Sequence, residues 1–173
     1  MRKVMKAALA LMLFAASAFA QNPADVAKAA CGPKGVSFDV NLDRSKHALT
    51  QPDPGKARIY FIHQAGNHAT FGVNPTTRIG IDGAWVGAYR SNAYFSVSVG
   101  PGEHHLCADL QSLATGHQLE LAHFTARAGK MYYYRTRLFL TQGVDYLELN
   151  PVDSDQAKLL IATFPQSVSH PRK

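Results

Sequence analysis

The chain has 173 residues, of which 46% are hydrophobic and 17% charged, which predicts a single folded domain and excludes disorder for most of its length. Three of its 18 Lys and Arg residues lie within the first six positions, and without them 15 basic residues remain against 12 acidic ones. The resulting net charge of +3 is too small to indicate a nucleic-acid-binding protein.

The first 20 residues have the pattern of a cleaved signal peptide. Basic residues precede an apolar run at Ala7–Ala16, and the small-residue pattern Ala18-Phe19-Ala20 follows. These three parts in this order predict export to the periplasm or secretion, with cleavage after residue 20. The apolar run is shorter than the roughly 20 residues that span a bilayer, so we expect no stable membrane insertion after cleavage. The first cysteine, Cys31, lies far beyond the run, which argues against a lipoprotein.

The chain contains two cysteines, Cys31 and Cys107. An exported protein meets an oxidising compartment, so we predict a disulfide between them. Two separate thiols or a redox pair are the alternatives, and the absence of a Cys-x-x-Cys motif argues against the redox pair.

Residues 21–55 form an N-terminal segment and linker. The stretch "PADVAKAA" can form one short helix, and Val36–Leu42 alternates so that its apolar side chains share one face, as in a strand. The turn-rich stretch Thr50–Lys56 then leads into the main domain, which we place at residues 56–165.

The main domain shows one strand pattern after another. "ARIYFIH" is apolar on both faces, which predicts a central strand. Asp82-Gly83 separates "TTRIGI" from "AWVGAY" and is typical of a two-residue hairpin. In the next strand, Phe95, Val97 and Val99 share a face. Four further strands are expected in the segments "HHLCADL", "HQLELAHFTA", "MYYYRTRLFL" and "VDYLELN".

After these strands the apolar spacing becomes helical in "DSDQAKLLIATF", with Asp153 as the N-cap and Gln156 completing a capping pair. We expect this helix to cover an open end or an edge, and residues 166–173 to be a flexible tail. The predicted fold class is all-β: an antiparallel β-sandwich of about seven to nine strands with one C-terminal helix, a short N-terminal helix being left open.

The motifs "IDG-x-x-VG" at residues 81–87 and "V-x-PG-x-H" at residues 99–104 carry a family resemblance. With "ARIYFIHQ", they make residues 57–150 resemble the bacterial domain-of-unknown-function 2846 family, and they are similar to PEGA-type repeats of envelope proteins. The resemblance implies a small envelope-associated β domain without an established activity. Members often look like lipoproteins, and this chain differs from them in lacking a lipid-accepting cysteine.

Histidines are the residues most suggestive of chemistry. Glu103-His104-His105 comes nearest to a metal-binding cluster, although adjacent strand residues point to opposite faces. His63 and His123 lie in apolar alternations and are expected to be hydrogen-bonded core residues. A metal-binding protein or hydrolase is therefore the alternative hypothesis, and its candidate ligands are His63, His68, His104 and His105, with Glu103.

Other catalytic signatures are absent from the sequence. It has no G-x-S-x-G elbow, no H-E-x-x-H motif, no phosphate-binding glycine loop and no recognisable carboxylate pair, and it indicates no cofactor. Cys107 and His105 would share a strand face, but the expected disulfide uses the same sulfur. The first hypothesis is therefore a secreted or periplasmic non-enzymatic module with a binding or structural role in the cell envelope.

One candidate binding surface follows from the segment "MYYYRTRLF". Strand alternation with Tyr132 facing inward would place Tyr133, Arg135 and Arg137 outside, a combination common at binding surfaces. Trp85, next to the hairpin turn, is a second candidate anchor. The alternatives are an ordinary solvated strand face and a tryptophan packed across the sheet. An envelope protein or a glycan is the expected partner, and a homodimer through this face or a sheet edge is a further hypothesis.

Overall fold

The computed structural model describes residues 22–45, 49–65, 75–111, 119–141 and 144–172. Within them the chain forms two short helices and ten strands. In chain order the elements are α1 (Pro23–Ala30), β1 (Phe38–Asp43), β2 (Ala57–Ala65), β3 (Thr77–Ile81), β4 (Ala84–Tyr89), β5 (Ala93–Val99), β6 (Gly102–Leu110), β7 (Leu119–Ala126), β8 (Met131–Thr141), β9 (Val144–Pro151), α2 (Ser154–Thr163) and β10 (Gln166–Pro171).

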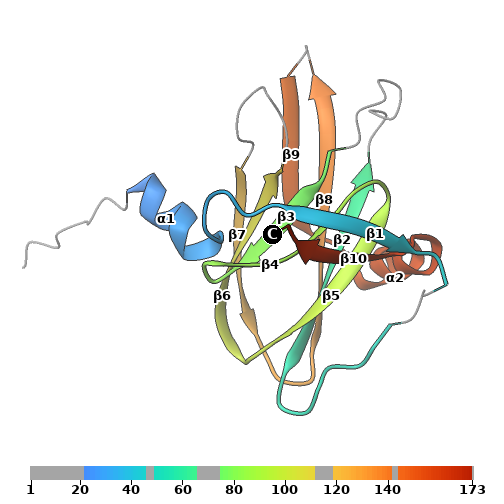
Figure 1. The fold of residues 1–173 in the computed structure, drawn as a ribbon. Coiled ribbons are helices and arrows are strands. Elements are labelled where there is room, and N and C mark those ends of the chain that lie inside the picture. Colours follow the sequence, from blue (N-terminus) through green and yellow to red (C-terminus); the bar gives the residue numbers. More distant parts are fainter. Residues whose placement is uncertain (1–21, 46–48, 66–74, 112–118, 142–143, 173) are drawn as a thin grey trace, which may run out of the picture.

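The strands build two sheets that pack against each other (Figure 1). The larger sheet has the order β1-β10-β5-β2-β8-β9, and the smaller has the order β4-β3-β6-β7. The predicted β-sandwich is confirmed, but the described residues contain more strands than the expected seven to nine. The expectation of purely antiparallel sheets is wrong, because β2 runs parallel to β8 and β10 runs parallel to β5. The turn motifs of a sequence reveal only those strand pairs that a short loop joins, and these pairs are antiparallel. Parallel pairs therefore leave no turn motif by which to predict them.

The main core lies between the two sheets. Phe61 of β2 and Leu106 of β6 are fully buried and come from opposite sheets. Phe95 of β5 joins them, and Val97 and Val99 pack against the same cluster, as their shared face predicted. β2 lies between β5 and β8 and is buried on both faces, which confirms the central strand.

The predicted hairpin is present between β3 and β4. Ile81 pairs with Ala84, and the two turn residues have positive φ angles, 50° for Asp82 and 80° for Gly83. This is the backbone conformation that a tight two-residue turn requires, and glycine adopts it without steric cost.

Helix α2 covers the outer face of the six-stranded sheet. Asp153 caps it by accepting hydrogen bonds from the backbone amides of Asp155 and Gln156. A second apolar cluster lies beneath the helix and comprises Tyr60, Ile62, Tyr94, Tyr133, Ala157, Leu160 and Ile161. The helix was therefore predicted correctly, but it covers a face rather than an end or an edge. β2 carries apolar side chains on both faces, so its outer face needs a cover of its own.

The expected flexible tail at residues 166–173 is wrong, because Gln166–Pro171 forms β10. β10 pairs with β1 along its whole length and meets β5 at Gln166 and Tyr94. On β4, the hydroxyl of Ser167 donates to the carbonyl of Ala88, whose amide donates to Ser169. Residues 166–171 show little apolar alternation, so the sequence gives no strand signal there. Hydrogen bonds with the backbone of β1, β4 and β5 hold them in the strand conformation.

The N-terminal segment has two parts: α1 and Cys31 lie on the outer face of the four-stranded sheet, whereas β1 is an edge strand of the six-stranded sheet. Both of its predicted elements, α1 and β1, are present. The predicted disulfide between Cys31 and Cys107 is confirmed. Gly80 of β3 lies so close to the segment that an added Cβ would come within 2.8 Å of the Ala30 carbonyl oxygen. Neither helix in the described part of the chain has the length and hydropathy needed to cross a bilayer.

Candidate functional site

His63 is part of the scaffold between the sheets. It is 1% exposed, its Nδ1 lies 2.8 Å from the Thr136 hydroxyl, and its ring stacks on Tyr89 at 5.2 Å. The Tyr89 hydroxyl completes the group at 2.9 Å from the same Thr136 oxygen. Burial lowers the pKa of His63 to about 4, so the ring is neutral at pH 7. The expectation of a hydrogen-bonded core histidine is confirmed here.

The same expectation is wrong for His123, which is exposed on β7. Phe124 and Ala126 of this strand are buried instead. Neighbouring strand residues point to opposite faces, and the large aromatic ring of Phe124 occupies the core face.

His104 joins two turns. Its Nδ1 lies 2.6 Å from an Asp82 carboxylate oxygen, and its Nε2 lies 2.9 Å from the Gly100 carbonyl oxygen. Partial burial acts to lower the pKa of His104, but its hydrogen bonds to Asp82 and Gly100 outweigh burial and raise it. The two partners occupy both ring nitrogens, so neither nitrogen is free to bind a metal.

The histidines proposed as metal ligands are therefore not brought together. His63 lies in the core, His104 is bonded at the hairpin, His105 is exposed on the other face of β6, and His68 lies outside the described residues. Across the described ranges, no three His, Cys, Asp or Glu residues form a group that could hold a metal ion.

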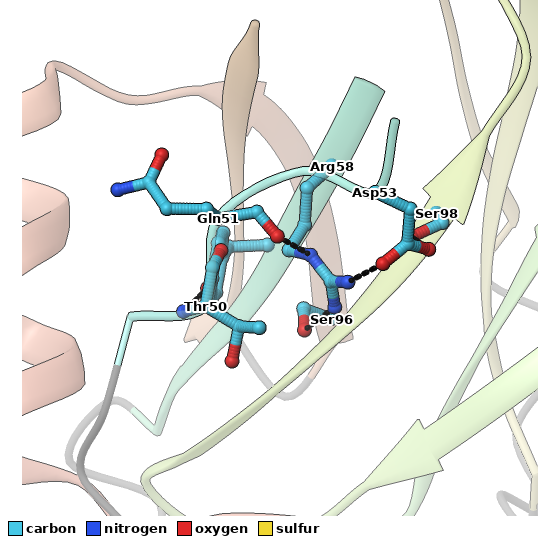
Figure 2. Close-up of polar contacts among 7 residues, drawn as sticks. Thr50, Gln51, Asp53, Arg58, Ser96 and Ser98 are labelled. Atoms are coloured by element: carbon cyan, nitrogen blue, oxygen red, sulfur yellow. Dashed lines mark hydrogen bonds and ion pairs between the residues drawn. The ribbon is translucent and has the colours of Figure 1, made fainter. Parts of the chain in front are cut away.

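A polar cluster around Arg58 fastens the linker to the outer face of β2 and β5. Figure 2 shows the Arg58 guanidinium between the Gln51 carbonyl oxygen and the Asp53 carboxylate. Its Nε donates to the Gln51 oxygen at 3.2 Å, and its Nη2 donates to the Asp53 carboxylate at 3.1 Å. The Ser98 hydroxyl donates to the second Asp53 oxygen at 2.6 Å, and this bond is the main cause of the lowered pKa of Asp53. The charged groups of this cluster pair with one another. We therefore interpret its role as structural: it holds residues 50–56 against the sheet.

Trp85 is also committed to the scaffold. It is half-buried, its Nε1 donates to the Pro33 carbonyl oxygen at 2.8 Å, and its ring lies 4.2 Å from the Arg78 guanidinium. Arg78 in turn bonds the buried carboxylate of Asp109, with its Nε 3.0 Å from Oδ2, and donates to the Val36 carbonyl. The prediction of a binding anchor at Trp85 is corrected: the N-terminal segment covers this tryptophan.

An exposed face with aromatic and charged side chains lies on β8 and β9. We call it the β8–β9 face and define it by Arg135, Arg137, Phe139, Tyr146 and Glu148. The strand register places Arg137 opposite Glu148 and Phe139 opposite Tyr146. The Arg137 guanidinium lies 4.8 Å from the Phe139 ring centroid, and Tyr146 is 48% exposed. Arg135 is partly buried and donates to Gln64 at 3.3 Å.

Two corrections follow for the predicted binding surface. Tyr133 is 8% exposed and packs under α2, so it is not available. Arg135 and Arg137 do face outward, and they are joined by Phe139 and Tyr146, which the sequence reasoning missed. Continuing the alternation along β8 would have found Phe139, whereas Tyr146 requires the register with β9.

Comparisons with known proteins give no relative: no protein-family model, no curated protein and no solved structure matches the chain. The resemblance to the domain-of-unknown-function 2846 family therefore stays a prediction.

Proposed function

We propose that the protein is a secreted or periplasmic non-enzymatic binding module that holds an envelope glycan on the β8–β9 face. The observation that carries the proposal is the arrangement of this face. Two aromatic rings lie in register beside an arginine that stacks on one of them. Aromatic rings pack against the C–H faces of sugars, while guanidinium and carboxylate groups bond their hydroxyls.

The chemistry of the remaining residues supports a binding role. Both cysteines are joined in the disulfide, His63 is buried and neutral, and His104 is bonded at both nitrogens. These residues, which suggested chemistry, therefore serve the scaffold, whereas the β8–β9 face offers an exposed surface for a partner. A disulfide persists in an oxidising compartment, which supports the proposed export.

Cosedimentation with purified peptidoglycan tests the proposal. Arg137→Ala and Tyr146→Ala should each weaken binding about tenfold, as expected for central contact residues. Arg172→Ala is the matched control, because Arg172 is an exposed arginine that bonds Asp39 on the β1–β10 side of the same sheet.

The proposed glycan binding on the β8–β9 face would be refuted if Arg137→Ala bound peptidoglycan as well as Arg172→Ala and the wild type do. Capture of a single envelope protein without any glycan, lost in Arg137→Ala, would keep the face and replace the ligand class. Light scattering at several concentrations separates both results from homodimer formation.

A further inference from the structure

Two histidines that lie far apart in the sequence are direct neighbours on the four-stranded sheet. His105 of β6 is paired with His123 of β7 in the strand register. Both residues are exposed, and both lie on the sheet face opposite the core. No hydrogen bond recorded within the described residues engages either ring, in contrast to His104, which is bonded at both nitrogens.

The backbone hydrogen bonds bring these two side chains close together. The carbonyl of His105 accepts from the Asp82 amide, and its amide donates to the Asp82 carboxylate at 2.9 Å. Both backbone groups of His105 therefore point toward β3 and away from β7. His105 and His123 form a non-hydrogen-bonded pair, the class in which opposite Cα atoms are only about 4.5 Å apart.

This spacing suits chelation of a metal ion. Imidazole nitrogens bind Zn²⁺ at about 2.0–2.1 Å, and imidazole also suits copper and nickel. Two rings that project in the same direction from neighbouring positions can reach one ion between them. Glu103 is exposed two residues before His105, on the same face of β6, but among the described residues no third His, Cys, Asp or Glu joins the pair in a group that could hold a metal ion, so the site has two protein ligands.

We propose that His105 and His123 form a binding site for a divalent transition-metal ion on the outer face of β6 and β7. Cu²⁺ binds most tightly, ahead of Ni²⁺ and Zn²⁺, as general ligand preferences dictate. Water fills the remaining coordination positions. The site is independent of the β8–β9 face, because it lies on the outer side of the other sheet.

The test measures Cu²⁺ affinity of the untagged protein by competition with a chelator of known strength. His105→Gln and His123→Gln should each weaken binding roughly 100-fold, since losing one of two linked ligands removes the gain from chelation. Glu103→Gln should leave the affinity unchanged, because Glu103 is not a ligand of this two-histidine site. The matched control is His170→Gln, which removes an exposed histidine of β10 and should change nothing.

Imidazole NMR spectra during a Zn²⁺ titration give a second measurement. The His105 and His123 resonances should shift together with one midpoint, and circular dichroism checks that each variant is folded. Independent midpoints for the two rings would overturn the proposal. So would an affinity that is unchanged in both His105→Gln and His123→Gln, because the bound ion would then lie elsewhere.

Discussion

Acidification should destabilise the protein through His63. The folded state holds this ring neutral with a pKa of about 4, whereas the unfolded chain protonates it near the ordinary value of 6.5. Because the folded pKa is depressed, the unfolded state binds the additional proton as the pH falls below 6.5. The contribution of His63 to the free energy of unfolding is therefore fully present above pH 6.5. It is lost progressively as the pH falls from 6.5 to 4.

The linkage relation sets the size of this effect. With pKa values of 6.5 and about 4, protonation of the unfolded state removes roughly 2 kcal/mol of stability between pH 7 and pH 5. The full loss below pH 4 is roughly 3 kcal/mol. Other groups titrate in the same range. His104 acts in the opposite direction, because its raised pKa means that the folded state favours the protonated ring. Its stabilising contribution is present at low pH and is lost as the pH rises through the pKa of the folded state.

His63→Phe isolates the contribution. Phenylalanine keeps a ring to stack on Tyr89, and the Thr136 hydroxyl keeps its bond to the Tyr89 hydroxyl. Urea unfolding at pH 7 and pH 5, followed by the fluorescence of the single tryptophan, gives the free energies of unfolding. Between pH 7 and pH 5, the free energy of unfolding of the wild type should fall by roughly 2 kcal/mol more than that of His63→Phe. Equal losses in the two proteins would refute the reasoning, as would an NMR titration in which the His63 ring protonates above pH 6.

Two further predictions concern the covered face of the four-stranded sheet. Replacing Cys31 and Cys107 together by alanine should lower the free energy of unfolding by about 4–5 kcal/mol, from the loop-closure entropy of a link across 76 residues. A loss below 1 kcal/mol in urea unfolding would contradict this role. Asp109→Ala should cost about 3–5 kcal/mol, because it leaves the charge of Arg78 buried without its partner. Adding Arg78→Met to Asp109→Ala should recover most of that loss. If Asp109→Ala alone were as stable as the wild type, the ion pair would be excluded as a stabilising feature.

Local signals in the sequence predicted the local parts of the fold. The Asp82-Gly83 turn, the cap at Asp153 and the apolar faces of β2 and β5 each depend on residues a few positions apart. The disulfide was predictable for a different reason, since the chain has only two cysteines. These features need no knowledge of which strands are neighbours.

The features that could not be predicted depend on pairings between distant segments. β2 pairs with β8 in parallel, and no turn motif announces such a pair. The position of α2 follows from this pairing, because Tyr60 and Tyr133 become neighbours beneath it and Tyr133 is lost as a surface residue. The opposition of His105 and His123 likewise depends on the register of β6 and β7, which neither strand shows alone.

The two proposed surfaces flank the same side of the sandwich. β7 is an edge of the four-stranded sheet, β9 is an edge of the six-stranded sheet, and the two strands are in contact. At the opposite side, the serines of β10 bond the backbone of β4 and so close its edge. At the β7–β9 side, burial and the nearby charge of Glu148 raise the pKa of Glu120.

Carboxylates at an edge discourage another strand from pairing there, since a newcomer would have to bury them. We therefore expect the β7–β9 side to resist uncontrolled strand addition, while its flanking faces remain exposed. Both the β8–β9 face and the His105–His123 pair depend on this arrangement, because a strand added to β7 or β9 would bring its own side chains beside them. A ligand bound there has to recognise side chains rather than an open backbone edge, which is why we expect single side-chain substitutions to weaken binding strongly.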